Sequence, residues 1–349
     1  MSYITRTKDW DIKINKNYEP EVSIIVPTYN ESKVIVKKII NLSNINYPSN
    51  KLEILIVDSA SNDNTVEIAK DYIKNFDFPF KVKFLIEKER RGKAKALNYA
   101  LEHAEYDIIA TSDADSYWEP LALKMALSYL YDQTVGAVTG REKFLNKNQN
   151  ILTLGEELYR QIYYKMRIGE SKLHSTQIFQ GELSIYKRSL FNKFNDEKGS
   201  DDCGTVVNII SKGYRTILSP ESIFYDFAPT KLKDRFILKK RRALHVIHAL
   251  LIAIKLKIKN LFPQPSRILY TNFFIHIINP FLIVPLFFFI MYFIYIKPIL
   301  IALILLLLIK RFRTMFVAYF SSNLALIMAV ISYMRGEELI KWEKIQGMR

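Results

Sequence analysis

Short apolar segments alternate with amphipathic segments along the first third of the chain. The apolar segments are rich in Val and Ile, and the segments between them space their apolar residues for one face of a helix. This alternation predicts an α/β fold with a doubly wound parallel sheet, in which ligands bind beyond the carboxyl ends of the strands. We expect strands at 22–26, 53–57, 81–86 and 106–111, and helices at 31–44, 64–75 and 93–104.

Two carboxylates follow the fourth expected strand, in the run Ser112-Asp113-Ala114-Asp115. In extended backbone, residues two apart point the same way, so Asp113 and Asp115 are expected to converge beyond the strand end. Hard oxygen ligands in this arrangement suit Mg²⁺ or Mn²⁺ carrying a diphosphate. An isolated Asp-x-Asp is more often a solvated turn, so the neighbouring segments decide between the two interpretations.

Further polar residues lie at or near the expected strand ends. Asp58 follows the strand 53–57 and can accept a hydrogen bond from a nucleobase or a ribose hydroxyl. Asp63 precedes the next helix, where an N-cap role is favoured over ligand binding. Arg91 and Lys93 flank a glycine that opens the helix 93–104, where backbone N–H groups and a lysine can hold a diphosphate.

The second half of the domain is less regular. We expect helices at 120–130, 152–166 and 206–212, a strand at 135–139 and an extended segment at 177–186. Asp201 and Asp202 precede the helix at 206–212. Adjacent acids in this position are usually helix-capping residues, but one of them can be a general base if its surroundings adjust its pKa.

The C-terminal third is both basic and apolar. Residues 231–267 indicate basic amphipathic helices at a membrane interface, with an ordinary domain-closing helix as the alternative. Residues 268–309 are expected to form a hairpin of two membrane helices, with its break near Pro298 or near Ile290.

A further apolar segment at 315–333 either crosses the membrane or lies along its surface, so residues 268–334 hold two to three spans. The basic cluster at 310–313 is expected to be cytoplasmic by the positive-inside rule. Residues 335–349 form a basic tail.

The composition limits the classes of protein that fit. The 349 residues include 50 Lys and Arg against 35 Asp and Glu, a net charge of +15. Basic residues beside apolar runs are typical of a membrane-surface protein and not of a nucleic-acid-binding protein. The single cysteine, Cys203, excludes an internal disulfide and a cysteine-based zinc site. Residues 1–20 are polar and contain no signal-peptide segment, so we expect the domain at 21–230 to be cytoplasmic.

Several ordered motifs resemble those of the family 2 glycosyltransferases. This family comprises inverting enzymes with a GT-A fold, among them dolichyl-phosphate sugar synthases and hyaluronan and cellulose synthases. The resemblance covers about residues 20–245. It rests on VSIIVPTYNE (22–31), VDSASNDNT (57–65), RGKAKALN (91–98), SDAD (112–115), FQGELSIYKR (179–188) and the spacing from Asp201-Asp202 to Gly213-Tyr214.

The resemblance implies a role for each matching residue. It implies that Asp58 contacts the base or ribose of the donor and that Lys93 lies near the diphosphate. Asp113 and Asp115 would hold Mg²⁺ or Mn²⁺, with Asp115 as the direct ligand, and Asp202 would deprotonate the acceptor hydroxyl. The remaining residues expected to contact substrate are Pro27, Tyr29, Glu31, Arg91, Asp113, Gly181, Glu182, Asp201, Arg241 and Arg242.

Three positions depart from the family pattern. Ser59 stands where the family often has a second Asp, and Asp201 stands where it usually has Glu. Processive members carry Gln-x-x-Arg-Trp after the base, whereas Lys239–Ala243 matches only at Arg242 and lacks the tryptophan that would stack on sugar. The last of these departures favours a single transfer over polymer synthesis.

The sequence therefore predicts a multi-pass inverting glycosyltransferase of the cell membrane. The expected donor is a nucleotide-sugar, with UDP as the expected nucleotide, and the expected acceptor is a lipid or a lipid-linked glycan at the cytoplasmic face. If the acceptor is a lipid phosphate, Asp202 is less needed, and the basic stretch 231–242 would hold the phosphate through Arg241 or Arg242.

Two alternatives remain open. One is a processive polysaccharide synthase of the hyaluronan or cellulose synthase type. The other is a non-catalytic membrane scaffold with a GT-A fold, which is disfavoured because the acidic residues are intact: Asp58, Asp113, Asp115 and Asp202.

Overall fold

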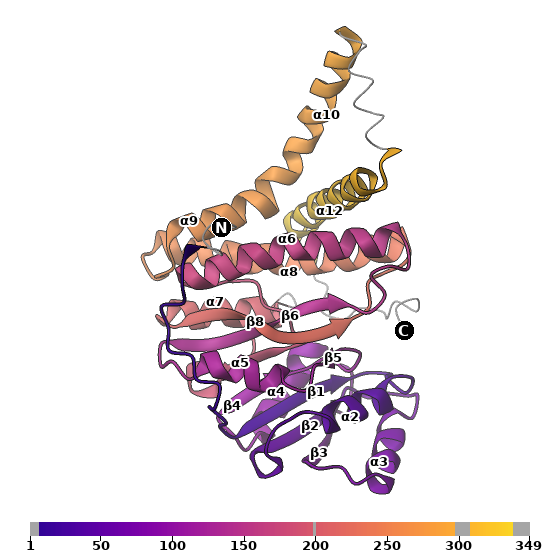
Figure 1. Ribbon diagram of the computed structural model, residues 1–349, viewed down its shortest axis with the longest axis vertical. Coiled ribbons are helices and arrows are strands. Elements are labelled where there is room, and N and C mark those ends of the chain that lie inside the picture. The colour runs from indigo at the N-terminus through magenta and orange to yellow at the C-terminus, as the bar shows by residue number, and fades with distance from the viewer. Residues whose placement is uncertain (1–6, 198–199, 297–307, 338–349) are drawn as a thin grey trace.

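The computed structural model describes residues 7–197, 200–296 and 308–337, and its centre is one eight-stranded mixed sheet (Figure 1). The strand order is β3-β2-β1-β4-β7-β6-β8-β5. The strands are β1 (Val22–Thr28), β2 (Leu52–Asp58), β3 (Lys81–Ile86), β4 (Ile108–Thr111), β5 (Tyr117–Trp118), β6 (Val135–Phe144), β7 (Ser184–Lys187) and β8 (Arg215–Asp226).

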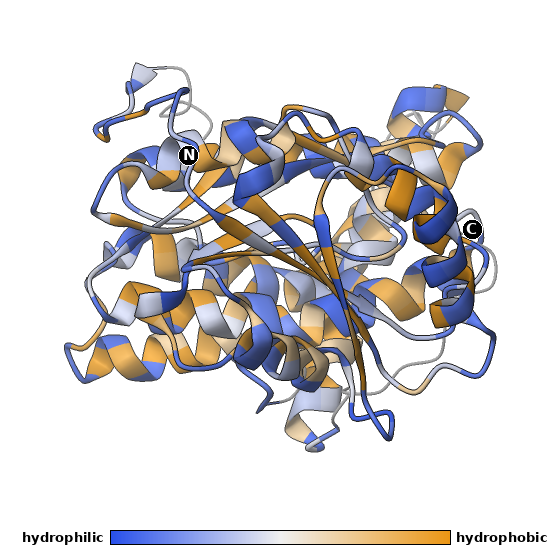
Figure 2. Ribbon diagram, turned by 90° about the horizontal axis from the view of Figure 1, so that it is seen from below, coloured by the Kyte–Doolittle hydropathy of each residue, from blue (hydrophilic) through white to orange (hydrophobic). Residues whose placement is uncertain are grey.

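The first four strands are mutually parallel, as the sequence predicts. Alternate side chains of β1 enter different cores: Val22, Ile24 and Val26 pack in one, and Ile25 packs in the other. Both faces of the sheet are therefore buried, which explains the nearly continuous apolar strands (Figure 2). The helices that follow these strands are α2 (Ile35–Ser43), α3 (Thr65–Asn75) and α4 (Lys93–His103), and α5 (Ala122–Leu130) comes next along the chain.

The second half of the sheet differs from its prediction. Of the extended segment expected at 177–186, only the part from Ser184 is a strand, β7; residues 181–182 form a turn, and residues 177–180 belong to no helix or strand. The strand β8 was not predicted at all, because Ser219, Pro220, Glu221 and Ser222 interrupt its apolar pattern. Helices α6 (Ile151–Leu173) and α7 (Asp201–Ser211) are both longer than expected.

The long helix α8 (Leu232–Ile258) joins the sheet domain to the C-terminal helices. Its residues Ala249 and Leu250 belong to the core on one face of the sheet, whereas Leu244 packs with Leu326 of α12 (Lys310–Met334). Figure 1 shows α6 and α8 side by side above the sheet, with α12 over them. Because α8 packs against the sheet domain on one side and against α12 on the other, it is part of the folded core. It is therefore not only a helix at a membrane surface, as the sequence had suggested.

A helical segment leads away from the domain: its first part is packed against the domain, where Leu269 and His276 are buried, and its far part is exposed. It consists of α9 (Ser266–Phe273), a π-helical turn (Phe274–Ile278) and α10 (Asn279–Ile296). The α10 helix passes through Ile290 without a break, so the alternative hairpin break there is wrong. The break near Pro298 and the helix expected over 299–309 lie mostly in residues 297–307, outside the described part of the chain.

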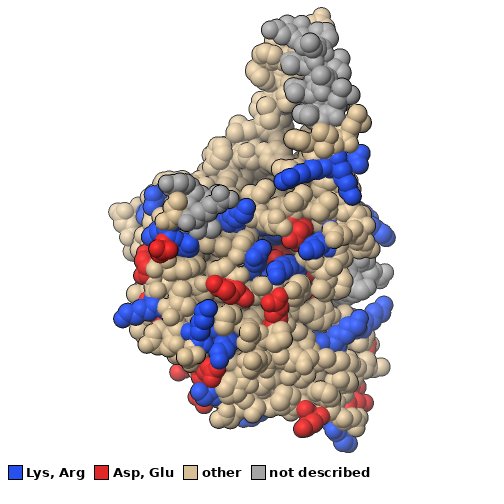
Figure 3. All heavy atoms as spheres, in the orientation of Figure 1, with Lys and Arg blue, Asp and Glu red and all other residues tan. Residues whose placement is uncertain are grey.

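Among the described residues, two helices are long and apolar enough to cross a membrane, by length and composition only. They cover Ser266–Phe293, of which little is buried, and Lys310–Met334, of which one side is buried against the domain. In Figure 3 the projecting α10 shows no charged atoms, in contrast to the mixed charges on the body below it.

Candidate active site

The carboxyl ends of β1, β2 and β4 bring the predicted donor residues to one edge of the sheet. Asp58, at the end of β2, is 2% exposed. Its carboxylate accepts hydrogen bonds from the Thr28 hydroxyl at 3.0 Å and from the backbone N–H of Ser61 at 2.8 Å. Asp58 therefore fixes the loop that follows β2, and its contact with a nucleotide stays a prediction. Asp63 accepts from the backbone N–H of Thr65, the first residue of α3, in agreement with the favoured capping role.

A second acid at this edge was missed. Glu87 follows β3, is 4% exposed, and accepts hydrogen bonds from the Ser59 hydroxyl and from Arg91, with an ion-pair distance of 2.7 Å to Arg91. Its place directly after a strand, like that of Asp58, is the signal that could have found it. The guanidinium of Arg90 lies 4.0 Å from the centre of the Tyr29 ring. These contacts hold the basic turn against the ends of β1 and β3.

Lys93 is the centre of the charged cluster at this edge. Its ammonium lies 2.5 Å from Asp113 Oδ1 and 3.9 Å from Asp201 Oδ2. Burial alone would raise the pKa of Asp113, but the Lys93 charge holds it below its usual value. A Cβ on Gly181 would lie 2.6 Å from Lys93 Nζ, so only glycine leaves room for this side chain.

Asp113 and Asp115 do not lie on extended backbone, which corrects the geometric argument from the sequence. The chain turns at Ala114 and Asp115, and the hydroxyl of Ser116 closes the turn by donating to the carbonyl of Asp113 at 3.0 Å. Lys38 supports the turn from behind, donating to the Ser112 hydroxyl at 2.5 Å and to the Ser116 carbonyl at 2.8 Å. Burial lowers the pKa of Lys38 to about 7, while Asp113 and Asp115 act against that shift.

Asp201 and Asp202 are the first two residues of α7 and serve different parts of the site. Asp201 faces Lys93 on the donor side, and burial, followed by repulsion from Asp202 and Asp113, raises its pKa to about 7 against the attraction of Lys93. Asp202 lines a cavity on the other side of the helix end, and its Oδ1 accepts from the N–H of Cys203 at 2.6 Å. Asp202 therefore faces this cavity, whereas Asp201 faces Lys93.

Arg242 of α8 lies among three carboxylates. It is 2.6 Å from Glu182, 3.5 Å from Glu142 and 3.6 Å from Asp226, while oxygens of the three acids lie within 4.8 Å of one another. An acidic group of this kind could hold a metal ion, but the Arg242 guanidinium already lies among its oxygens and offsets part of its charge. Burial and then the positive charge of Arg242 lower the pKa of Arg241 to about 10, while Asp113 and Glu182 act against this shift.

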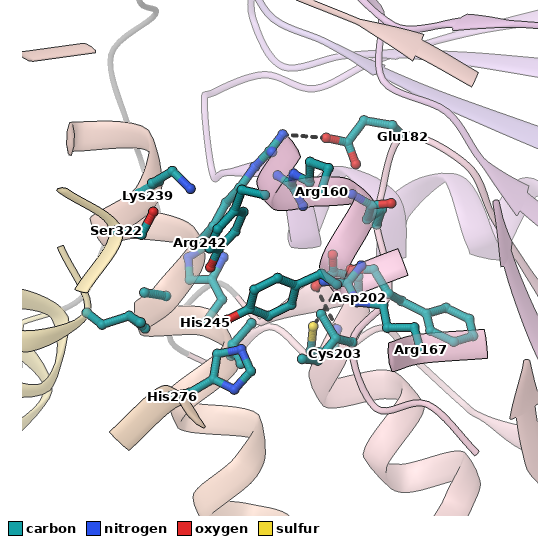
Figure 4. A pocket seen from close by; sticks show the side chains of 18 residues that line it. Arg160, Arg167, Glu182, Asp202, Cys203, Lys239, Arg242, His245, His276 and Ser322 are labelled. Atoms are coloured by element: carbon teal, nitrogen blue, oxygen red, sulfur yellow. Dashed lines mark hydrogen bonds and ion pairs between the residues drawn. The ribbon is translucent and has the colours of Figure 1, made fainter. Parts of the chain in front are cut away.

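The cavity beside Asp202 has a volume of about 130 Å³ and lies between the sheet domain and the C-terminal helices (Figure 4). Its walls come from α6, α7, α8, the π-helical turn and α12. The sequence did not predict this cavity, because its residues are far apart along the chain. The residues that line it are Tyr159, Arg160, Tyr163, Arg167, Ile178, Phe179, Gln180, Glu182, Asp202, Cys203, Lys239, Arg242, Ala243, His245, Val246, His276, Ser322 and Leu326.

Comparisons with known proteins agree with this architecture. Residues 23–194 match the model of glycosyl transferase family 2. The chain is similar in structure to the mannosyltransferase PcManGT from Pyrobaculum calidifontis, solved in complex with GDP-Man and Mn²⁺. The TM-score is 0.81 and the identity 30%, over 97% of this chain and 93% of that chain.

Two curated relatives match in sequence over shorter stretches. The probable glycosyltransferase YdaM of Bacillus subtilis (strain 168) is 27% identical over 222 residues, which are 61% of this chain and 52% of YdaM. The poly-beta-1,6-N-acetyl-D-glucosamine synthase of Staphylococcus aureus (strain COL) is 25% identical over 242 residues, 66% of this chain and 56% of the synthase. The chain therefore spans about half the length of these relatives.

The chain belongs to glycosyl transferase family 2, and the predicted GT-A fold is confirmed. Membership of this family and the likeness to PcManGT identify it as a glycosyltransferase. The structure brings together Lys93, Asp113, Gly181 and Asp201, as the sequence predicts for a donor site. The roles of the individual residues stay predictions, including those of Pro27, Tyr29 and Glu31 near the end of β1.

Proposed function

We propose that this protein is a membrane-bound inverting glycosyltransferase that adds one sugar to a lipid-linked acceptor at the cytoplasmic membrane face. The single observation that carries the proposal is the position of Asp202. It opens into a cavity whose other walls include Ser322 of α12 and His276 of the π-helical turn, both in helices long enough to span a membrane. An acceptor bound there reaches the catalytic carboxylate from the side of the membrane helices.

The exposed faces of these helices support membrane insertion. The buried face of α12 consists mainly of small and polar residues such as Ala318, Ser322 and Ala329, whereas its exposed face carries Phe316 and Phe320. Large apolar residues directed away from the protein are costly in water and favourable in lipid. The basic residues of 310–313 at the start of α12 fit the cytoplasmic side.

The donor edge fits a divalent cation. Asp113 and Asp115 offer hard carboxylate oxygens in one turn, beside the ammonium groups of Lys93 and Lys38, and this set suits Mg²⁺ or Mn²⁺ with a diphosphate. A metal bound there would supply charge stabilisation for the departing diphosphate. We assign the metal to this turn and not to the triad Glu142, Glu182 and Asp226, since Arg242 occupies that triad.

Under this proposal, one group of residues binds the donor and Asp202 acts on the acceptor. Lys93 and the N–H groups at the start of α4 bind the diphosphate and orient the sugar. The carboxylate of Asp202 takes the proton from the acceptor hydroxyl as its oxygen attacks the anomeric carbon, opposite to the leaving diphosphate. The new glycosidic bond forms as the bond to the diphosphate breaks, which inverts the configuration.

Membrane attachment is tested by fractionation of cells that express the full chain. The full chain should remain with membranes until detergent is added, and a chain ending at Thr230 should lose most of this association. Recovery of the full chain in the soluble fraction without detergent would contradict membrane insertion.

Transfer is tested with purified full-length protein, Mn²⁺, and labelled GDP-mannose or UDP-N-acetylglucosamine in separate reactions, each with a bacterial lipid extract. We expect one organic-extractable product of fixed mass with one donor. Asp202→Asn should reduce transfer to a hydroxyl acceptor by roughly 10²–10⁴-fold with donor affinity little changed. Asp115→Asn should remove turnover and weaken donor binding, and full activity in excess chelator would contradict the metal assignment.

A processive synthase is the second candidate, because the S. aureus relative is a polysaccharide synthase. Lys239–Ala243 lacks the Gln and Trp of processive members. This argues against an enzyme that holds a growing polysaccharide between successive additions. A ladder of products, or a polymer of high mass, would favour this second candidate.

A further inference from the structure

The cavity beside Asp202 contains a buried cation whose charge has no direct partner. Arg167 of α6 is 7% exposed, and its Nε has no hydrogen-bond partner. Within the described part of the chain, no hydrogen bond or ion pair of its guanidinium is found. A guanidinium stays protonated, and an unpaired buried charge is costly by several kcal/mol. Such a residue needs either a structural reason or a ligand.

Glu170, Cys203 and Glu142 attract the charge of Arg167, but none of them forms an ion pair with it in the described part of the chain. Glu170, one turn along α6, attracts it, but the Glu170 oxygens accept hydrogen bonds from Thr176 and Asn272 at 2.8 Å each. Arg160 repels it, and burial lowers the pKa of the Arg167 guanidinium.

The other cations of the cavity wall are already paired. Arg160 lies 2.9 Å from Glu142, Lys239 lies 3.0 Å from Glu156, and Arg242 lies 2.6 Å from Glu182. Their charges are balanced by the domain itself, so Arg167 is the cation of this wall that is available to an incoming anion. This distinguishes it from Arg242, which the sequence had suggested as a phosphate clamp.

The cavity has the size and the position for an anionic group of the acceptor. Its volume of about 130 Å³ is well above the roughly 10–15 Å³ that one water needs in the same measure. Figure 4 shows Arg167 and Asp202 on one side of the cavity, with Ser322 of α12 opposite. A guanidinium binds phosphate through two parallel N–H donors, and Leu326 of α12 adds an apolar wall that continues toward the membrane helices.

We propose that Arg167 forms an anion subsite for the phosphate of a lipid-linked acceptor, and so anchors the acceptor while its hydroxyl approaches Asp202. The proposal rests on the proposed function, because it assigns the acceptor side of that site. It names an anchoring group, and the phosphate itself takes no part in bond formation.

Binding is tested by thermal unfolding of the purified full chain in detergent, without donor or turnover. The probes are farnesyl phosphate, farnesol and inorganic phosphate at equal concentration. The variants are Arg167→Gln and, as a matched control for charge, Lys165→Gln on the exposed side of the same helix. Farnesyl phosphate should raise the Tm of the wild-type and Lys165→Gln proteins but not that of Arg167→Gln, and farnesol should have no effect.

Other results would overturn the proposal. If inorganic phosphate raises the Tm as much as farnesyl phosphate does, the site does not select a lipid phosphate. If Arg167→Gln keeps the Tm shift, Arg167 does not form the anion subsite. Without ligand, Arg167→Gln should melt no lower than wild type, because it removes an unpaired buried charge. A much lower Tm would show that the guanidinium is structural.

Kinetics separate this subsite from the transfer reaction. With an active lipid acceptor, Arg167→Gln should raise the acceptor KM by roughly 10–100-fold, as expected for a lost charge-assisted hydrogen bond, and leave donor hydrolysis unchanged. A binding shift without any glycosyl transfer would contradict the proposed function alone, whereas transfer with an unchanged acceptor KM in Arg167→Gln would contradict the subsite alone.

Discussion

The substitution Gly181→Ala is a sharp test of the donor side, because it adds one methyl group at a point of contact. The new Cβ would lie 2.6 Å from Lys93 Nζ and 3.6 Å from its Cε. Carbon atoms in contact prefer about 3.5–4.0 Å, so the ammonium has to move by roughly 1 Å. The movement is possible because Nζ is the end of a flexible side chain. We therefore expect the fold to remain intact and the position of the ammonium to change.

The cost follows from the contact that is lost. Lys93 Nζ lies 2.5 Å from Asp113 Oδ1, and a displacement of this size takes the pair beyond the usual hydrogen-bond limit. A hydrogen bond between charged groups contributes about 1.5–3 kcal/mol, which corresponds to roughly 10–150-fold in affinity. The proposed contact of Lys93 with the donor diphosphate is of the same kind, so Gly181→Ala should weaken donor binding by that factor, and loss of the Lys93–Asp113 contact should also lower the Tm.

A double-mutant cycle identifies the cause. Donor affinity would be measured by calorimetry in the presence of Mn²⁺ for wild type, Gly181→Ala, Lys93→Met and the double variant. If the methyl group acts through Lys93, it should change affinity by less than about 0.5 kcal/mol once the ammonium is absent. The reasoning is refuted if Gly181→Ala binds donor normally, or if it costs as much in the Lys93→Met background as in wild type.

Three further predictions concern stability, and each is checked by the Tm of the purified protein. The pKa of Asp201 is about 7 in the folded state and 3.8 in the unfolded state, so Tm should fall as the pH rises from about 3.8 to about 7. The Asp201→Asn variant should show a smaller fall. Gly155→Val should lower Tm without removing the donor site, because a Cβ on Gly155 already lies 3.1 Å from Ala318 of α12 and overpacking costs about 1–3 kcal/mol. Glu156→Gln should be more damaging than Arg235→Met, because it leaves several buried cations without their carboxylate; equal Tm values for these two variants would contradict this explanation.

The donor side was predictable because its residues directly follow strands. Asp58 and Asp113 come at the ends of apolar runs that can be recognised in sequence, and the parallel sheet then places those ends together. The start of the helix at Lys93 can likewise be recognised from neighbouring residues in the sequence. The sequence did not predict the hydrogen bonds that these residues make. Asp58 is engaged by its own loop, and the turn at Asp115 depends on support from Lys38 of α2, which no local pattern encodes.

Asp202 was predicted, but the cavity beside it was not predictable, because its walls are assembled over long sequence separations. Arg167 and Asp202 come from different helices, and neither has a signal in the sequence that links it to Ser322 of α12. The strand β8 was missed for a similar reason: its interrupted apolar pattern is compensated by pairing with β6 and β5. Burial of polar residues by distant elements overrides local propensity in such segments.

The domain boundary predicted between residues 230 and 231 falls just before α8, and the cavity uses residues from both sides of it. Asp202 stands on one side, while Arg242 of α8 and Ser322 of α12 stand on the other. Arg242 also neutralises acids of the sheet domain, so removal of α8 would leave Glu182 and its neighbours as an uncompensated buried cluster. The C-terminal helices therefore complete the cavity beside Asp202, and under the proposed function their anchoring in a membrane would hold that cavity and Asp202 in one arrangement.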